Sequence, residues 1–340
     1  DSNCGNQDSS IDSGSGHNKL TFGASSNVLG HDGEIVFVVE EDTGTGKVIA
    51  IDTSGKCVDV IDHDELGVDS GKGFSPEALT IKTIAGEDHL FVSGGYDRGD
   101  GDGDRGYFYT KNLTSGKTTS CNVYNSIVFR ETNSITVADG GTLLYAALKG
   151  HVWKYQLEKI DDGSGGITYC PITERAKNDA AGGLNREYYD YYNYGCSSPT
   201  KHCKANQIEI DPNDSSIMYL TAYADGLFQK VKINNMLGTL VPIEKKGTED
   251  SQKTVSDAQV NFDFPTGIHV TSTSIWVTDR KPSVQRFNKN DLTWLSSFGG
   301  KGRRIDGAIS AIRAVVTDTS FTSSANFGYG YWNSGIGENA

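Results

Sequence analysis

The sequence predicts an all-β protein, and more specifically a β-propeller of six blades. Helical periodicity is nearly absent, and short β-branched runs alternate with clusters of Asp, Asn and Gly, with 41 glycines and only 7 prolines. Five segments repeat one strand–turn–strand pattern, and they begin at Ile35, Leu90, Leu143, Ile217 and Ile275. Their spacings of 55, 53, 74 and 58 residues are close to one four-stranded blade, except for the 74.

Four of these units follow a short apolar strand that we expect to be the inner strand of a blade: PEALTI, TNSITV, ANQIEI and PTGIHV. A further strand, SAIRAVVTD from Ser310, opens a last blade that continues into FTSSANFGYGYWN. We expect the early strand KLTFGAS from Lys19 to join this tail and close the ring, because each blade buries its faces only against two neighbours. The count becomes seven if the insertion at about residues 174–204 holds a degenerate blade.

The chain is expected to contain one domain. Residues 1–18 are rich in Ser, Gly and Asp and are expected to be a separate N-terminal segment. Residues 19–340 then form a single propeller domain, interrupted by the long insertion.

One blade carries a specific motif. The stretch FDFPTGIHVTSTSIWVTDRKPSVQRFNKNDLTWLSSFGGKG has a Pro-x-Gly-Ile opening, a Val-Thr-Asp that ends its second strand, a Val-Gln-x-Phe third strand and a closing Phe-Gly. It resembles an NHL repeat over about 40 of the 340 residues, whereas the other blades share only the pattern. The resemblance implies an NHL-like or regucalcin-like six-bladed propeller. It implies no particular activity, because this fold hosts hydrolases, lyases, receptors and scaffolds.

Charge and cysteines restrict the partners and the compartment. The net charge is −13, and the 31 Lys and Arg are scattered among 44 Asp and Glu, which argues against a nucleic-acid partner. No run approaches the roughly 18 apolar residues of a membrane helix. The six cysteines form no CxxC pair, so we expect disulfides rather than zinc, and Cys196 and Cys203, which enclose a short loop, are the predicted pair. With sequons at Asn112 and Asn213, this composition indicates a secreted glycoprotein.

The first candidate metal site is the acidic stretch YDRGDGDGDRG, residues 96–106. Asp100, Asp102 and Asp104 alternate, so a loop can turn their carboxylates toward one hard cation such as Ca²⁺, and Asp97 is the candidate fourth ligand. The spacing resembles an EF-hand loop, but Arg and Lys stand at the positions of its turn glycine and bidentate Glu, so it is not an EF-hand. The alternative is a solvated acidic hairpin between the second and third strands of a blade.

A second candidate site comes from aligning the inner strands. Just before the apolar core of each strand, one column holds Glu77, Asn133, Asn206 and Thr266. This end of an inner strand faces the central channel, where four blades would supply oxygen ligands. The arrangement is similar to that of calcium-dependent propeller hydrolases of the gluconolactonase and arylesterase kind, whose metal is held by Glu, Asn, Asn and Asp. Thr266 replaces the Asp and removes a charge, and the alternative is a polar lining of a water-filled channel.

His269 is the histidine that the pattern places on an inner strand, in TGIHV. A copper- or zinc-dependent lyase propeller, which also resembles NHL blades, needs several channel histidines. A single inward histidine is more often satisfied by a hydrogen bond, which is the arrangement we expect. The chain also lacks the GxSxG elbow of serine hydrolases.

The 74-residue spacing contains the Tyr-rich stretch NREYYDYYNYGC. We expect this insertion to connect the outer strand of one blade to the inner strand of the next and to project over one face of the disc. Its five tyrosines are Tyr188, Tyr189, Tyr191, Tyr192 and Tyr194. Consecutive residues point different ways, so these rings cannot all face inward and some of them are exposed. Exposed Tyr with Arg is typical of a contact surface for protein or sugar. The alternative is an Ω-loop that buries its rings against the disc.

The leading hypothesis is a secreted binding or assembly protein that contacts a protein or carbohydrate partner, or a second copy of itself, through the Tyr-rich segment. The alternative is a calcium-dependent hydrolase or lactonase with its site in the central channel. Convergence of the side-chain oxygens of Glu77, Asn133 and Asn206 on one point would favour the enzyme. Pairing of these side chains with their neighbours would favour the binding protein.

If the four aspartates of the acidic stretch bind Ca²⁺, removing calcium should lower the melting temperature, because a ligand bound only to the folded state stabilises it by mass action. The measurement is thermal unfolding in excess calcium and in chelator. The double variant Asp100→Asn with Asp102→Asn should melt at the same temperature in both. Identical wild-type curves in the two conditions would contradict a calcium site.

Overall fold

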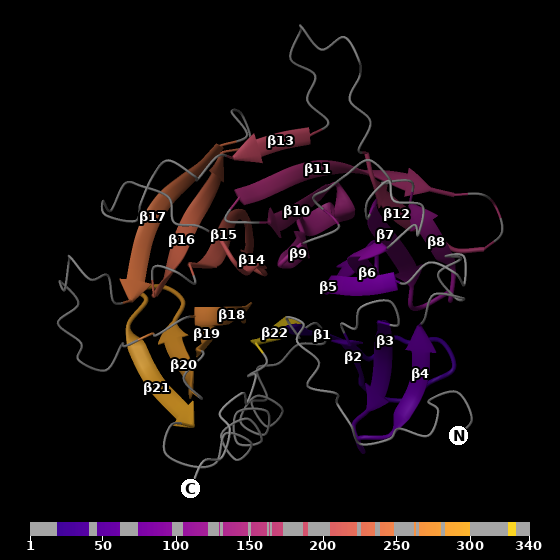
Figure 1. Cartoon of the computed structure of the whole chain (residues 1–340), viewed down its shortest axis with the longest axis horizontal. Coiled ribbons are helices and arrows are strands. Elements are labelled where there is room, and N and C mark those ends of the chain that lie inside the picture. The colour runs from indigo at the N-terminus through magenta and orange to yellow at the C-terminus, as the bar shows by residue number, and fades with distance from the viewer. Residues whose placement is uncertain are drawn as a thin grey trace, which may run out of the picture.

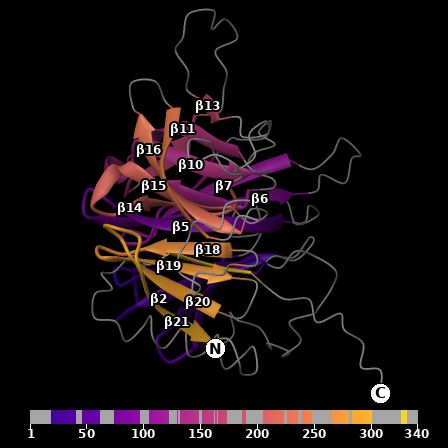
Figure 2. The same ribbon diagram turned by 90° about the vertical axis from the view of Figure 1, so that its left-hand side faces the viewer.

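The computed structural model describes 17 parts of the chain. They are residues 19–40, 46–61, 74–96, 105–121, 129, 132–148, 151–161, 163, 165–172, 186–189, 205–222, 226–234, 239–247, 262, 265–279, 283–299 and 326–330. The described strands form five antiparallel sheets set around a ring, as Figure 1 shows, and Figure 2 gives the same sheets from the side. The chain is therefore an all-β propeller, with five blades in its described part. No helix in this part is long and apolar enough to cross a membrane.

Blade 1 contains both ends of the described chain. Its strand order is β22-β1-β2-β3-β4, with β1 at Lys19–Ser25, β2 at Ile35–Glu40, β3 at Lys47–Asp52, β4 at Cys57–Ile61 and β22 at Asn326–Gly330. Blade 2 runs in chain order through β5 (Phe74–Ile84), β6 (Glu87–Tyr96), β7 (Arg105–Asn112) and β8 (Thr118–Cys121).

Blade 3 contains β9 (Ser134–Val137), β10 (Leu143–Leu148), β11 (His151–Ile160) and β12 (Thr168–Pro171), and the short helix η1 (Asp139–Gly141) joins β9 to β10. A further strand, β13 (Arg186–Tyr189), also pairs with β11. Blade 4 contains β14 (Ile208–Asp211), β15 (Asp214–Ala222), β16 (Leu227–Asn234) and β17 (Thr239–Gly247). Blade 5 contains β18 (Pro265–Val270), β19 (Ser274–Asp279), β20 (Ser283–Asn288) and β21 (Trp294–Gly299).

The ring closes through β1 and β22, as the sequence predicted. Leu20 of β1 pairs with Tyr329 of β22, and Phe22 pairs on its other edge with Val38 of β2. β22 lies beside β18 of blade 5, and β1 lies beside β5 of blade 2. Because β1 has β2 and β22 on its two edges, the tail and the first repeat share one sheet, and the described part has five blades rather than six. The strand expected from Ser310 lies outside the described residues.

The core consists of apolar layers between neighbouring blades. Leu79 and Ile81 of β5 pack with blade 1, whereas the alternate residue Ala78 packs with blade 3. Separate apolar clusters likewise join blade 3 to blade 4 and blade 4 to blade 5. Both faces of blades 2, 3 and 4 are therefore covered, which explains why their strands are apolar in near-continuous runs rather than in strict alternation.

In the β3–β4 turn of blade 1 and the β7–β8 turn of blade 2, an Asp or Asn side chain accepts hydrogen bonds from the main chain of the turn. The Oδ1 atom of Asp52 accepts the N–H groups of Ser54 and Lys56. The Oδ1 atom of Asn112 accepts the N–H groups of Thr114 and Ser115 in the equivalent turn of blade 2. Asp and Asn favour turns because their side chains bond the main chain two residues on. The Asn112 sequon thus coincides with a turn signature of the repeat.

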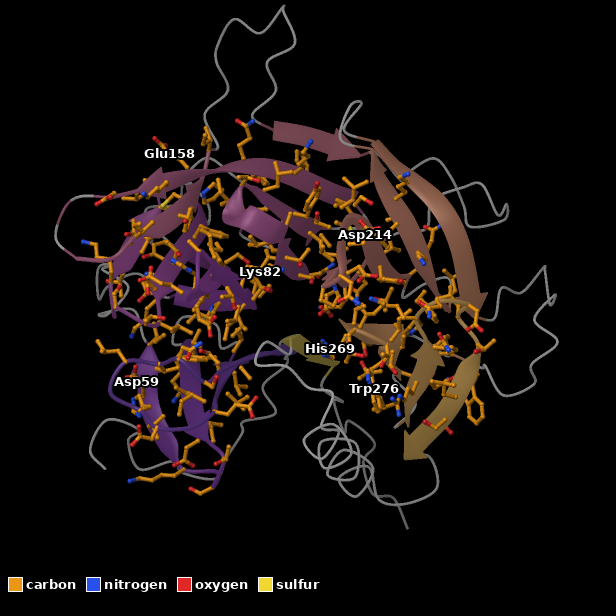
Figure 3. The ribbon with its side chains drawn as sticks, turned by 180° about the vertical axis from the view of Figure 1, so that it is seen from behind. Asp59, Lys82, Glu158, Asp214, His269 and Trp276 are labelled. Atoms are coloured by element: carbon orange, nitrogen blue, oxygen red, sulfur yellow. A yellow bond between two sulfur atoms is a disulfide. The ribbon has the colours of Figure 1, made fainter. Side chains whose placement is uncertain are left out.

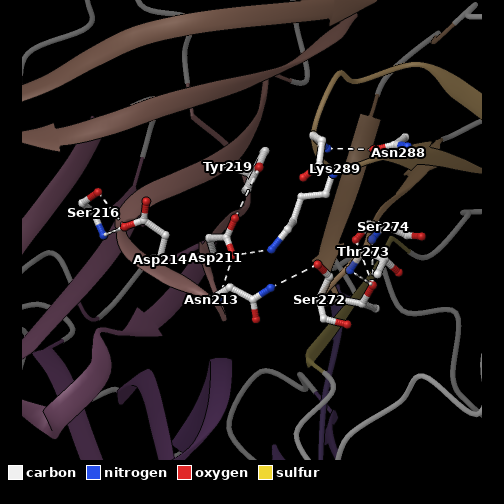
Figure 4. A network of polar contacts seen from close by, with 12 residues as sticks. Asp211, Asn213, Asp214, Ser216, Tyr219, Ser272, Thr273, Ser274, Asn288 and Lys289 are labelled. Carbon is white, nitrogen blue, oxygen red and sulfur yellow. Dashed lines mark hydrogen bonds and ion pairs between the residues drawn. The ribbon is translucent and has the colours of Figure 1, made fainter.

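Polar contacts also join the blades. The Asp88 carboxylate of blade 2 is 1% exposed and accepts hydrogen bonds from the Ser25 hydroxyl of blade 1 at 2.7 Å and from the Thr83 hydroxyl at 2.6 Å. The Lys289 Nζ of blade 5 lies 2.6 Å from the Asp211 Oδ1 of blade 4, with each side chain only 7% exposed (Figure 4). A buried charge is costly unless it is paired or hydrogen-bonded. Asp88 meets this requirement with two hydroxyl donors, and Asp211 meets it with Lys289.

Lys289→Ala should lower the free energy of unfolding by about 3–5 kcal/mol, because it leaves the buried Asp211 carboxylate without its cation. The measurement is urea unfolding at neutral pH. The matched control is Lys159→Ala, since the Lys159–Asp161 pair is 3.9 Å long and its side chains are 54% and 55% exposed. That change should cost less than about 1 kcal/mol. Equal losses of unfolding free energy in the two variants would show that the buried pair stabilises the fold no more than the exposed pair does.

Candidate functional site

The four residues of the predicted channel column lie at one level of their blades. Glu77 and Thr266 each occupy a β-bulge, where the inner strand slips by one residue against its partner. Asn133 and Asn206 stand at the corresponding ends of β9 and β14, and their N–H groups donate to main-chain oxygens of the second strands. All four side chains are half-buried. Bulges re-aim side chains and are frequent beside functional sites.

Polar side chains at this level bridge neighbouring inner strands. The Asn206 Nδ2 donates to the Thr266 main-chain oxygen at 3.2 Å, and the Thr266 and Thr278 hydroxyls lie 3.2 Å apart. The Gln207 Nε2 donates to the Asn133 main-chain oxygen at 2.6 Å. Glu77 and Asn133 also have interaction partners. The side chains of Asn206 and Gln207 therefore join blade 4 to its two neighbours.

The described part of the chain contains no cluster of three or more His, Cys, Asp or Glu side chains that could hold a metal ion. The candidate ligands Asp97, Asp100, Asp102 and Asp104 lie outside the described residues. Their loop follows Tyr96 and precedes Arg105, which pair with each other at the end of the β6–β7 hairpin. The acidic stretch thus joins the second and third strands of blade 2.

His269 has the hydrogen-bond partner that the sequence led us to expect, and that partner is Glu209. The His269 Nδ1 and the Glu209 Oε1 lie 3.1 Å apart, and both residues are less than 10% exposed. The Val270 N–H donates to the Glu209 Oε2 at 3.2 Å. Glu209 on β14 thus contacts both a side chain and the main chain of β18 in the next blade.

Burial raises the pKa of the Glu209 carboxyl above its ordinary value. His269, the Val270 N–H and the charge of Lys82 all favour the ionised form, but they do not offset the burial. Lys82 comes from β5 of blade 2, and Figure 3 shows Lys82 and His269 beside the centre of the ring. Three blades therefore place ionisable side chains near the channel.

Sequence reasoning missed Glu209, although a signal was present. In the alignment of inner strands, Glu209 and His269 fall in one column, with Thr80 and Thr136 at the same position. Register supports this alignment, because Thr136 pairs with Tyr145, Glu209 with Tyr219 and His269 with Trp276. A glutamate and a histidine in the same column of two consecutive inner strands would have indicated a contact between their blades.

The Tyr-rich segment begins as a strand of blade 3. Tyr188 and Tyr189 belong to β13, where they pair with Trp153 and Val152 of β11. Tyr191, Tyr192 and Tyr194 lie outside the described residues, as do Cys196 and Cys203. β11 carries β12 along its C-terminal half and β13 along its N-terminal half. The four described residues of the insertion therefore extend an existing sheet and add no blade.

Two blades are joined by a disulfide between Cys121 at the end of β8 and Cys170 of β12. Cys57 is also disulfide-bonded.

The two sequons differ in accessibility. Asn112 is 0% exposed, and its Nδ2 donates to the Glu87 Oε2 at 2.8 Å and to the Ile167 main-chain oxygen at 3.0 Å. A glycan on this nitrogen has no room in the folded protein, so Asn112 is withdrawn as an expected glycosylation site. Asn213 is exposed, in the turn between β14 and β15.

Comparison with known proteins identifies no family for this chain. No family model matches, and no curated protein matches. Similar solved structures include three that are each 13% identical to this chain. One is a functionally unknown protein from Desulfotomaculum acetoxidans DSM 771, with a TM-score of 0.46, covering 82% of this chain and 70% of that chain. The others are a candidate 6-phosphogluconolactonase from Bacteroides uniformis ATCC 8492 (TM-score 0.42, 77% of this chain and 65% of that chain) and an auxiliary nutrient binding protein from Bacteroides ovatus ATCC 8483 (TM-score 0.43, 85% and 66%). At this identity and these TM-scores the similarity carries no argument about function. The propeller fold is assigned from the strand pairing within this chain.

Glu209→Gln should remove part of the pH dependence of stability. A raised pKa means that the folded protein holds this proton more tightly than the unfolded chain does. The resulting stabilisation is full below the ordinary value of 4.5 and is lost as pH rises through the folded pKa. Glutamine cannot ionise, but its amide oxygen can still accept the Val270 N–H.

The measurement is the urea-unfolding free energy of wild type and Glu209→Gln at a series of pH values from 4 upward. The two curves should diverge as pH rises, with the variant gaining relative to wild type. The control is Glu158→Gln, because Glu158 is exposed and lies at the rim (Figure 3). Parallel curves for wild type and Glu209→Gln would contradict the raised pKa.

Proposed function

We propose that this protein is an extracellular β-propeller that binds a protein or carbohydrate partner through its Tyr-rich segment, residues 188–194. The observation that carries the proposal is the pairing of β13 with β11, which holds the start of this segment against the edge of blade 3. Residues that are already paired in a sheet, as Tyr188 and Tyr189 are, lose less conformational entropy on binding than residues of a free loop. Tyr adds large amphipathic rings with few rotatable bonds, which suits a contact surface.

The polar contacts near the channel favour binding over calcium-dependent hydrolysis as the function. Asn206 donates its side-chain N–H to a main-chain oxygen of the next blade. Glu209 and His269 are likewise engaged with each other. These side chains have structural partners, and a catalytic role would require them to exchange those partners for a metal or a substrate.

An extracellular location is supported by the Cys121–Cys170 disulfide, because such bonds persist mainly in oxidising compartments. Exposure of the Asn213 sequon is compatible with N-glycosylation there. Calcium is proposed as the ligand of the acidic stretch, whose carboxylates follow one another at the tip of a single hairpin.

The test replaces Tyr189, Tyr191 and Tyr192 together by Ser and compares this variant with the triple Phe variant. The probes are an array of immobilised glycans and sedimentation of the protein alone, which reports self-association. The Ser variant should lose glycan binding or self-association, since each aromatic anchor at a hot spot contributes about 2 kcal/mol or more. The Phe variant should retain most of the ring contact.

Both variants should keep the wild-type melting temperature, because blade 3 retains β9 to β12. A large loss of stability with unchanged binding would show that the rings are packing residues. Calcium-dependent hydrolysis of lactones, abolished by chelator and by Glu77→Gln, would instead establish the channel as the functional site.

A further inference from the structure

β21 is the outermost strand of blade 5, and its outer edge pairs with no other strand in the described part of the chain. Its inner edge pairs with β20. Figure 1 shows β21 at the outer rim of the ring, away from β13. The main-chain N–H and carbonyl groups of such an edge can bond another strand, so proteins normally protect exposed edges with charged residues, with proline or with a covering segment.

The outer strands of the other blades carry such protection. β17 contains Pro242 and three charged residues, and β13 contains an Arg and a Glu. β8 ends at Cys121, which is disulfide-bonded to β12 of the next blade. β4 contains Asp59, whose Oδ2 lies 3.5 Å from a lysine Nζ of blade 2. The sequence of β21, WLSSFG, has neither a charge nor a proline.

One column of the outer strands shows this difference at equivalent positions. The column is aligned by the second strand of each blade, where an aromatic residue occurs every time: Phe37, Phe91, Tyr145, Tyr219 and Trp276. Across the third strand, these rows end in Asp59, Thr119, Glu187, Glu244 and Ser296. Three of the five positions hold an acid, and the Thr119 hydroxyl lies 2.6 Å from the Thr168 hydroxyl of blade 3. In blade 5 the position holds a small neutral residue.

The residue beside Ser296 presents an apolar side chain to solvent. Leu295 is the extra residue of a β-bulge between β20 and β21, and it is 45% exposed. Val58 occupies the equivalent bulge of β4, where it is partly buried against the core. The apolar side chain that packs within blade 1 is thus exposed in blade 5.

The charge of the chain indicates what can pair with this edge. At a net charge of −13, two copies repel each other over most of their surface, and they can approach most closely where charge is absent. No charged residue occurs from Leu292 to Gly300, and the flanking charges are Asp291 and, outside the described residues, Lys301. These charges have opposite signs and stand equally far along the sequence from Ser296. An antiparallel pairing of two copies about Ser296 therefore aligns opposite charges, whereas a parallel pairing aligns like charges.

We propose that β21 is a self-association surface, in which the β21 strands of two copies pair antiparallel about a two-fold axis at Ser296. Each copy then satisfies the strand edge of the other, and the two copies of blade 5 form one continuous sheet. A two-fold contact of this kind closes on itself, so it forms a dimer and not a filament. A single pair of strands is a small contact, so the dimer forms and dissociates with protein concentration.

The dimer affects binding as well as assembly. Two joined copies present two Tyr-rich segments, so a surface with repeated ligands is bound at two points, and the second contact forms at a raised effective concentration. This consequence rests on the proposed function. The pairing of β21 does not, because β21 and the Tyr-rich segment belong to different blades.

The test compares Ser296→Glu with Ser296→Gln by sedimentation over a series of protein concentrations. Glutamate restores the acid that blades 1, 3 and 4 have in this column, and it would pair across the strands with Arg286, so the fold should accept it. At the two-fold axis, two glutamates would face each other, and dimerisation should weaken by about tenfold or more. Glutamine has nearly the same size without the charge, so Ser296→Gln should dimerise more strongly than Ser296→Glu. The control is Ser120→Glu, which adds the same charge at an exposed position of the outer strand β8 and should dimerise as wild type does.

Two further measurements separate this surface from the Tyr-rich segment and from a loss of folding. The variant with Tyr189, Tyr191 and Tyr192 replaced by Ser should keep the β21 dimer, and Ser296→Glu should keep the wild-type melting temperature. Amide hydrogen exchange of residues 294–299 should slow in wild type as protein concentration rises, and it should not slow in Ser296→Glu. The exchange measurement tests the proposal in wild type even if a variant fails to fold.

A wild-type protein that stays monomeric at every concentration would overturn the proposal. Protection of residues 294–299 that is high and independent of concentration in such a monomer would assign the edge of β21 to another segment of the same chain. A dimer that Ser296→Glu leaves unchanged would place the contact elsewhere and would also overturn the proposal.

Discussion

The innermost strand of a propeller blade has one edge without a strand partner, and the rest of this structure depends on how that edge is satisfied. Side chains from the adjacent blade make the missing bonds. The Ser134 hydroxyl contacts both the N–H and the carbonyl oxygen of Ile208, at 3.3 and 3.2 Å. Glu209 accepts the Val270 N–H in the same way, one junction further along the ring. Unpaired main-chain groups are costly when buried, so polar residues are required on the inner strands whether or not the protein has a channel function.

Much of the fold could be predicted because its signals are local. Strand lengths, turns and the period of the repeat are all written in short stretches, and the closing strand at Lys19–Ser25 was identified from its pattern alone. The number of blades was less predictable. It depended on whether Lys19–Ser25 pairs with Ile35–Glu40 or begins a separate sheet, and a β pattern specifies a strand without specifying which strand lies beside it. Pairing across more than 300 residues is decided by packing around the whole ring.

The candidate site was predictable only in position. The alignment put Glu77, Asn133, Asn206 and Thr266 in one column because register follows the strand pattern. It could not reveal the contacts of Asn206, Gln207 and His269, because those partners come from other blades, about 60–75 residues away. His89 shows the same limit. Nothing near it in the sequence indicates a carbonyl 78 residues further along the chain. The Asn112 sequon shows the opposite error. The local pattern suggested glycosylation, but Asn112 is buried and its side chain stabilises a turn.

The three junctions with buried ionisable groups are chemically different, and this difference has a consequence for the Tyr-rich segment. Asp88 uses hydroxyl donors between blades 1 and 2, and Asp211 uses Lys289 between blades 4 and 5. The same junction of blades 4 and 5 also holds the contact between Glu209 and His269, and burial raises the pKa of the Glu209 carboxyl. The junction of blades 2 and 3 combines a disulfide with a histidine ring, whose Nε2 lies 3.0 Å from the Ile167 main-chain oxygen. Blade 3 also carries β13 on the strand that pairs with β12. The proposed contact segment therefore extends from a blade that is covalently attached to its neighbour.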